Sequence, residues 1–169
     1  IEKQRLSWGV LDAFSEAAQQ AGIPATEDFN QGNNEGIGYF EVNQRSGWRW
    51  NTAQAFLRPT CYGRPNFEMW TSAQVPKLLM ETLPNGQQRC TGVEVWNGHE
   101  MVTANATQSV VLTAGAIGSP QLLQLSGIGP GAALQALGID VLADLSAVGQ
   151  HLQDHLCLDY YYRSRVPTL

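Results

Sequence analysis

Apolar residues near the start of the chain recur three and four positions apart, as one face of a helix requires. This stripe consists of Val10, Phe14, Ala17 and Ala21. The spacing predicts a helix from about Trp8 to Ala21. Ser7 is a suitable N-cap, and Gly22 followed by Pro24 is typical of a helix end.

The next part of the chain predicts short elements between polar loops. A loop rich in Asn and Gly covers residues 25–36. Residues 38–44 predict a short strand, because aromatic and β-branched side chains dominate there. Residues 51–57 predict a short helix that ends before Pro59, and the aromatic-rich residues 67–72 predict another strand.

Three further apolar runs are separated by Asn-Gly pairs. The runs cover residues 77–83, 89–96 and 100–105, and the pairs are Asn85-Gly86 and Asn97-Gly98. Asn-Gly between apolar runs is typical of type I′ hairpin turns, in which both central residues have positive φ. Two such turns in succession predict a three-stranded antiparallel meander over residues 75–105.

After residue 108 the pattern changes from alternating to continuous. Residues 109–114 are almost uniformly apolar, which predicts a strand covered on both faces. Gly115, Ala116, Ile117 and Gly118 then lead into a helix that Ser119 can cap, that Pro120 can begin and that ends near Gly127. The remaining predicted elements are a helix from Pro130 to Leu137, ended by Gly138, and a short strand over 139–142.

Composition excludes several classes of protein. The 169 residues are 43% hydrophobic and 15% charged, which excludes a disordered chain. The net charge of -5 argues against binding nucleic acid, and no apolar run approaches the ~18 residues of a membrane helix. The chain begins at Ile1 without an initiator Met or a signal peptide, so we expect a processed protein or a piece of a longer one.

The cysteines indicate a compartment rather than a site. Cys61, Cys90 and Cys157 lie far apart and form no C-x-x-C pair, which argues against a zinc ribbon or a thioredoxin-type site. We expect reduced, packed thiols and therefore a cytoplasmic location.

The strand–glycine turn–helix at residues 110–126 is the first candidate for chemistry. A helix N-terminus presents unpaired N–H groups and roughly half a positive charge. The small residues Ala114, Gly115, Ala116 and Gly118 would let a dinucleotide approach the backbone. The alternative is an ordinary tight connection, and the G-x-G-x-x-G fingerprint is absent.

Two clusters downstream and upstream of this turn have simpler interpretations. His151 and His155 lie four positions apart and could share a helix face around zinc, but Leu152 stands where a metalloprotease needs Glu. We predict no metal site, and we expect Asp154 and His155 to join a structural hydrogen-bond network, with an acid–base role for His155 as the alternative. Trp48 and Trp50 flank Arg49, which indicates a cation–π contact, stacking on a ligand, or a strand face that packs one ring inward.

Three segments resemble motifs of the glucose–methanol–choline (GMC) flavin oxidoreductases, in family order. Residues 113–130 (TAGAIGSPQLLQLSGIGP) resemble the second signature of the family. Residues 148–155 (VGQHLQDH) resemble its V-G-x-N-L-Q-D-H stretch, with His151 in place of Asn, and residues 40–59 resemble the segment before the flavin meander. The resemblance covers the chain from about Ser7 to its end.

The resemblance implies an α/β fold: part of an FAD-binding, doubly wound (Rossmann-like) domain with an antiparallel β-meander, plus part of a substrate-binding α+β domain. The FAD part would be residues 66–145, and substrate-domain segments would be residues 1–65 and 146–169. The pyrophosphate-binding strand–helix would precede Ile1, and the catalytic His with its His/Asn partner would follow Leu169. The first signature of the family is missing, and no catalytic residue is expected within the chain.

Cofactor contacts are implied at four positions. Val75 matches the valine whose backbone meets the adenine of FAD, and Ala114, Gly115 and Gly118 match the small residues that line the flavin nucleotide. Ser119 is expected to use its hydroxyl on the backbone as a helix cap rather than on a ligand.

The implied activity is oxidation of an alcohol CH–OH group by hydride transfer to the flavin, with oxygen or a quinone as electron acceptor. In choline-oxidising relatives a carboxylate two residues beyond the motif His holds the trimethylammonium group. The neutral Cys157 occupies that position, so choline is not favoured despite Asp159 nearby, and other primary alcohols stay open. We expect the 169 residues alone neither to retain FAD tightly nor to turn over. The alternatives are a non-catalytic nucleotide-binding module and an inactive truncated product.

Overall fold

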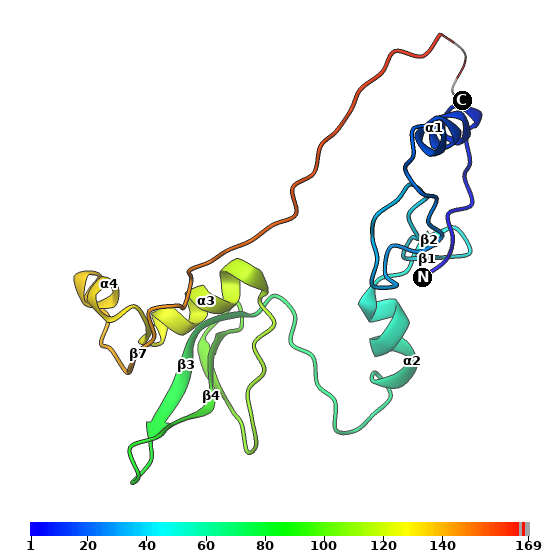
Figure 1. The fold of residues 1–169 in the computed structure, drawn as a ribbon. Helices are drawn as coiled ribbons and strands as arrows, with labels where there is room; N and C mark the ends of the chain where they lie inside the picture. Colours follow the sequence, from blue (N-terminus) through cyan, green and yellow to red (C-terminus); the bar gives the residue numbers. More distant parts are fainter. Residues whose placement is uncertain (166, 168–169) are drawn as a thin grey trace. The chain divides into compact units, whose positions relative to one another are not determined.

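The computed structural model describes residues 1–165 and 167, and the chain divides into two compact units. Unit 1 comprises residues 1–68 and the described part of 158–169, and unit 2 comprises residues 69–157. Both units contain helices and strands (Figure 1), so the expectation of a mixed α/β chain is confirmed.

Unit 1 begins with the predicted amphipathic helix. Helix α1 spans Gly9–Gln20 and ends before Gly22, whose φ is +92°. The N-cap is Trp8 and no side chain caps the helix, so the expectation that Ser7 is the N-cap is wrong. The apolar spacing therefore set the helix, while its first turn lacks the side-chain acceptor that Ser7 was expected to supply.

A small hairpin follows in place of the strand expected over residues 38–44. Strands β1 (Gln44–Arg45) and β2 (Trp48–Arg49) pair antiparallel across Ser46 and Gly47, which have φ of +52° and +81°. This is the type I′ geometry, and its signal in the sequence was the Ser-Gly pair. Within 38–44, Val42 forms only a single bridge to Glu2, because no longer strand lies beside it.

A helical turn crosses the predicted stop at Pro59. The π-helical turn η1 (Ala53–Leu57) continues directly into the short helix α2 (Arg58–Thr60), so Pro59 lies inside the first turn of α2. Proline has no backbone N–H to donate, so the helix forgoes one hydrogen bond at Pro59, while the N–H of Arg58 still donates to the carbonyl of Ala53 in η1. The expected strand over residues 67–72 is also absent.

Unit 2 contains the predicted meander. Strands β3 (Gln74–Thr82), β4 (Gln88–Trp96) and β5 (Met101–Asn105) form an antiparallel sheet in the order β3-β4-β5. The turns are not type I′ as expected, because only the glycines, Gly86 and Gly98, have positive φ. Asn85 and Asn97 instead accept backbone N–H groups two residues further on, at 3.0 and 2.9 Å, as in Asx turns.

One helix packs against this sheet. Helix α3 spans Gly115–Leu125 and lies against β3 (Figure 1). The expected start at Pro120 is wrong, because the positive φ of Gly115 (+86°) turns the chain into the helix five residues earlier. The strand expected over residues 109–114 does not form, because no described segment pairs with it, and Val111 is 77% exposed.

Two short parallel strands close unit 2. Strand β6 (Ile128–Gly129) pairs with β7 (Ala143–Asp144), and helix α4 (Gly131–Ala136) connects them before Gly138, whose φ is +72°. The helix agrees with prediction, whereas the strand expected over 139–142 is wrong, because the nearest strand is β7 at Ala143–Asp144. The pairing to β6 fixes that register, since Leu142 and Leu145 donate to Gly127 and Gly129 at 2.8 and 2.9 Å.

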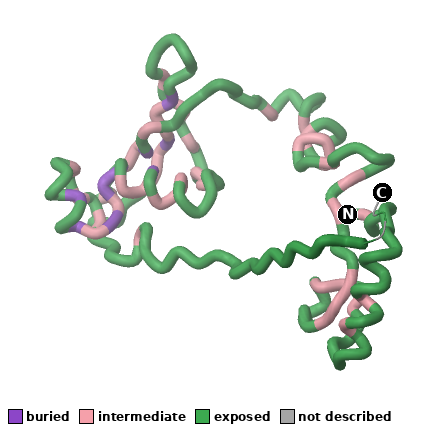
Figure 2. The backbone as a smooth tube through the Cα atoms, turned by 90° about the horizontal axis from the view of Figure 1, so that it is seen from above, coloured by how far each residue is buried: buried purple, intermediate pink, exposed green. Residues whose placement is uncertain are grey.

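The buried residues of the described chain all lie in unit 2, as the purple segments of Figure 2 show. The apolar core consists of Leu78, Val95, Leu122 and Leu134. These residues come from β3, β4, α3 and α4, and α3 packs on β3. Within the described residues, no helix combines the length and apolar character needed to cross a bilayer.

Candidate functional site

The N-terminal turn of α3 holds three of the four positions singled out in the sequence. Ala114 is the N-cap, Gly115 is the first helical residue and Gly118 lies one turn later. A Cβ built on Gly118 would lie 3.1 Å from the Cβ of Ala114, so only small side chains fit at both positions. A Cβ built on Gly115 would meet nothing within 4 Å, so open space adjoins the backbone there.

Ser119 stabilises this turn in a way that the sequence only partly predicted. Its hydroxyl oxygen accepts the N–H of Ala114 at 3.0 Å. The hydroxyl is therefore used on the backbone, as expected, but from inside α3 rather than from an N-cap position. The turn keeps its geometry while the first N–H groups of the helix remain available for an anion.

Val75, the fourth position, lies near the start of β3 and is 37% exposed. The packing of α3 on β3 brings the strand of Val75 and the helix of Gly115 into one assembly. Leu78 of the same strand donates its backbone N–H to the hydroxyl of Ser126 at 2.9 Å, directly after the end of α3.

A cleft of about 350 Å³ lies beside α3, between Ile117 and Leu152. Gln124, to which the sequence reasoning assigned no role, donates to the carbonyl of Val148 at 3.0 Å. Gly149 (φ +81°) approaches so closely that its Cβ would lie 2.6 Å from the side-chain nitrogen of Gln124. The segment from Val148 onwards is thus held against α3 by one amide, and an amide inside an apolar helix is the sequence signal for such a contact.

The histidine pair does not share a helix face. Residues 151–160 form no helix, and both histidines are exposed. His151 has a φ of +58°, a conformation that Asn adopts readily and His also tolerates, which explains why Asn can occupy this position in the motif. His155 donates its backbone N–H to the carboxylate of Asp154 at 2.8 Å, and the described residues form no wider network around the pair, contrary to expectation. Among the described residues, no group of three potential metal ligands comes together.

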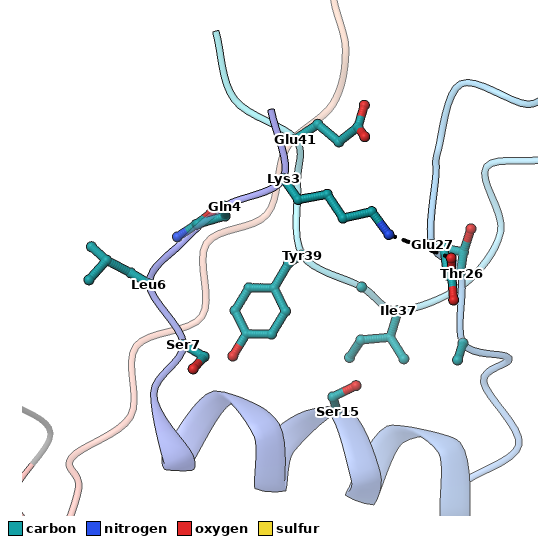
Figure 3. A pocket seen from close by; sticks show the side chains of 12 residues that line it. Lys3, Gln4, Leu6, Ser7, Ser15, Thr26, Glu27, Ile37, Tyr39 and Glu41 are labelled. Atoms are coloured by element: carbon teal, nitrogen blue, oxygen red, sulfur yellow. Dashed lines mark ion pairs between the residues drawn. The ribbon is translucent and has the colours of Figure 1, made fainter. Parts of the chain in front are cut away.

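A second cleft, of about 320 Å³, lies within unit 1 between α1 and the segment around Tyr39 (Figure 3). The Tyr39 ring points towards α1, where its hydroxyl donates to the carboxylate of Asp12 at 2.8 Å. This hydrogen bond raises the pKa of Tyr39 above its ordinary value of 10.0, since it favours the neutral phenol. Lys3 and Glu27 form an exposed ion pair at 3.5 Å across one end of the cleft.

Of the two tryptophans near the hairpin, Trp50 contacts Arg45 and not Arg49, the arginine between them in the sequence. The guanidinium carbon of Arg45 lies 5.3 Å from the centre of the Trp50 ring, whereas Trp48 is 76% exposed. The cation–π interpretation therefore holds for Arg45 and Trp50 and is wrong for Arg49. The β1–β2 hairpin brings Arg45 back beside Trp50, which adjacency in sequence could not indicate.

The sequence of the chain is similar to a known protein family and to known proteins. The family model described as GMC oxidoreductase matches residues 2–157. An oxygen-dependent choline dehydrogenase of Sinorhizobium medicae is 44% identical over 154 residues, which are 91% of this chain and 26% of that protein. The enzyme of the same name from Rhizobium rhizogenes is 43% identical over the same share of both chains.

Two solved structures resemble the chain. Pyridoxine 4-oxidase from Mesorbium loti superposes with a TM-score of 0.70 at 32% identity, over 86% of this chain and 28% of that one. An FAD-dependent oxidoreductase from Chaetomium thermophilum superposes with a TM-score of 0.73 at 27% identity, over 85% of this chain and 24% of that one. The chain spans about a quarter of the length of the relatives it matches, and with a family match over residues 2–157 it belongs to the GMC oxidoreductase family.

Proposed function

We propose that the protein containing this chain is an FAD-dependent oxidoreductase that oxidises an alcohol CH–OH group, and that unit 2 supplies part of the surface for the adenosine half of FAD. Bound FAD would supply the hydride acceptor. The contribution of this chain is to position the cofactor, since no catalytic residue is assigned within it. In this proposal residues 66–145 serve the cofactor, and residues 1–65 and 146–169 serve the substrate side.

The observation that carries the proposal is the open turn at Gly115. Its backbone is left-handed, nothing lies within 4 Å of where a side chain would begin, and it starts an 11-residue helix packed on the meander. Ala114 and Gly118 keep the turn small, so a nucleotide can reach the N–H groups of the helix. Val75 offers backbone N–H and C=O groups near the start of β3, the type of contact that a purine edge accepts.

The cofactor test uses two matched glycines. Gly115 and Gly98 both have positive φ (+86° and +97°) and open space around a built Cβ, so Ala costs similar backbone strain at either position. Only Gly115 lies in the proposed site, whereas Gly98 lies in the β4–β5 turn. In the protein made from the full reading frame, we expect Gly115→Ala to weaken FAD binding by about fivefold or more, a loss of about 1 kcal/mol.

Flavin absorbance and titration of the cofactor-free protein with FAD measure that effect. Unchanged FAD affinity in Gly115→Ala, or an equal loss of affinity in Gly98→Ala, would show that the Gly115 turn is not part of the FAD site. A full-length protein that carries no flavin would overturn the proposed function itself. We expect the 169 residues expressed alone to hold no FAD tightly and to show no turnover.

For the substrate we propose an uncharged primary alcohol. Cys157 is an exposed free thiol at the position where the resemblance implies a carboxylate in choline-oxidising relatives. A neutral thiol gives no ion-pair stabilisation to a quaternary ammonium group. The specific alternative is choline, because the curated relatives at 43–44% identity are named choline dehydrogenases.

The two substrates can be compared with a matched pair of compounds. Choline and its uncharged isostere 3,3-dimethylbutan-1-ol have the same shape but differ in charge. We expect a kcat/KM for the isostere at least equal to that for choline. A strong preference for choline would favour the alternative, and the same assay with oxygen and with a soluble quinone identifies the electron acceptor. The three free cysteines support a reducing compartment, for which we propose the cytoplasm.

A further inference from the structure

Ser126 is the one buried residue with a polar side chain among the described residues, at 2% exposed. It directly follows α3, and both hydrogen-bonding functions of its hydroxyl are used. The oxygen accepts the backbone N–H of Leu78 at 2.9 Å, and the hydroxyl donates to the carbonyl of Leu122 at 2.7 Å. The bond to Leu78 joins residues that are 48 positions apart in the sequence.

This bond uses a group that the sheet leaves free. Strand β3 is an edge strand, because the order of the sheet is β3-β4-β5. Every second backbone N–H of an edge strand points away from its neighbour and needs another partner. At Leu78, which is itself buried, that partner is Ser126, so the hydroxyl fixes one point of β3 to the C-terminal end of α3.

The joint sets the relative position of the two elements of the proposed cofactor surface. Val75 lies three residues before Leu78 on β3, and Gly115 begins the helix that ends just before Ser126. A strand and a helix transmit position along their length because their own hydrogen bonds keep them rigid. We infer that Ser126 is a positioning residue, whose hydroxyl holds β3 and α3 in the register that lets Val75 and the Gly115 turn contact one FAD molecule.

This inference rests on the proposed function, and its test uses Ser126→Ala in the full-length protein. The substitution leaves the Leu78 N–H without an acceptor in a dry site. Titration of the cofactor-free protein with FAD should show a Kd at least about fivefold above wild type. Hydrogen exchange at the Leu78 amide should be faster in Ser126→Ala without FAD, a readout that does not depend on the loaded enzyme.

Thr91→Val is the matched control. Thr91 also uses a partly buried hydroxyl on a backbone group, donating to the carbonyl of Leu79 at 3.3 Å, but it joins β4 to β3 within the sheet. We expect this variant to lower the melting temperature while its FAD Kd stays at the wild-type value. Thr91→Val shows how much the Kd for FAD changes when only thermal stability is lost. The inference requires that Ser126→Ala raise the Kd by more than this amount.

The outcomes separate this inference from the function on which it rests. A wild-type protein without FAD overturns the proposed function. A flavin-binding wild type with an unchanged Kd in Ser126→Ala, or with an equal rise in Thr91→Val, overturns the positioning role alone. If Ser126→Ala does not fold, Ser126→Cys replaces the hydroxyl by a slightly larger thiol that is a much weaker acceptor, and a folded Ser126→Cys protein with wild-type Kd overturns the inference in the same way.

Discussion

Replacing Gly92 with Ala tests how closely the strands of the meander approach. Gly92 is a buried residue in β4, paired with Leu79 on one side and Asn105 on the other. A Cβ at this position would overlap the carbonyl oxygen of Ala104 and lie 3.0 Å from the Cα of Asn105. Both neighbours are backbone atoms of a paired strand, so they cannot move aside as a flexible side chain would.

The position also lies at an irregularity of the sheet. Gly92 pairs with Leu79 while Cys90 pairs with the next residue, Met80, so Thr91 is an extra residue in β4. Glycine is typical of such bulges and of close backbone approaches. Overpacking of this kind costs about 1–3 kcal/mol. We therefore expect Gly92→Ala to lower the free energy of unfolding by that amount.

Urea unfolding followed by circular dichroism measures this loss as a shift in the midpoint at constant slope. Gly9→Ala is the control, because a Cβ there meets nothing within 4 Å and the residue begins helix α1. Alanine favours helix by up to about 1 kcal/mol over glycine, so the control should be neutral or stabilising. Equal midpoints for the two variants would refute the steric reasoning.

Three further predictions concern the core, a helix start and pH. Leu134→Ala, at 1% exposed, should cost about 2–5 kcal/mol in urea unfolding, whereas Leu137→Ala, at 74% exposed at the C-cap of the same helix, should change little; equal losses would contradict the assigned core. Asp144 accepts the N–H of Gly131 at 2.8 Å at the start of α4, so Asp144→Ala should cost about 1 kcal/mol and Asp144→Asn much less, and no difference between the two would exclude a capping role. The raised pKa of Tyr39 means that its bond to Asp12 stabilises unit 1 fully below the ordinary tyrosine pKa and is lost as pH rises through the folded value. Tyr39→Phe should therefore remove a tyrosine ionisation above the ordinary value of 10.0 from the ultraviolet titration, and an unchanged titration in that range would contradict the assignment.

Elements with strong local signals agree with their prediction from sequence. Helix α1 follows from one apolar stripe, and the meander follows from three apolar runs divided by Asn-Gly pairs. These elements form from contacts between residues close in sequence, so a short window contains the information. The turn type escaped prediction because Asn85 and Asn97 used their side chains as acceptors instead of adopting positive φ.

Predictions failed where an element needed a distant partner. The apolar run at residues 109–114 has the composition of a covered parallel strand, but no described strand lies beside it. Residues 38–44 have strand-forming side chains and find only the bridge at Val42. Strand propensity reflects packing against neighbouring strands. A segment with strand-forming side chains therefore forms no strand where no neighbouring strand lies beside it.

The candidate cofactor surface divides in the same way. The small residues at 114–116 and 118 and their resemblance to a family signature could be read from the sequence, and so could family membership, because motifs are local strings. The open space at Gly115 depends on which atoms from other segments come near it, and the local sequence cannot indicate that.

The sequence by itself therefore determined the local elements, the family and the small residues of the candidate cofactor surface. Only the tertiary structure decided that Ser126 joins β3 to α3, that Gln124 holds the segment after Val148, and that Arg45 rather than Arg49 covers Trp50. Each of these contacts is selected by the packing of segments that are separate in sequence, because a buried hydroxyl or amide takes whichever backbone group the fold brings within hydrogen-bonding distance.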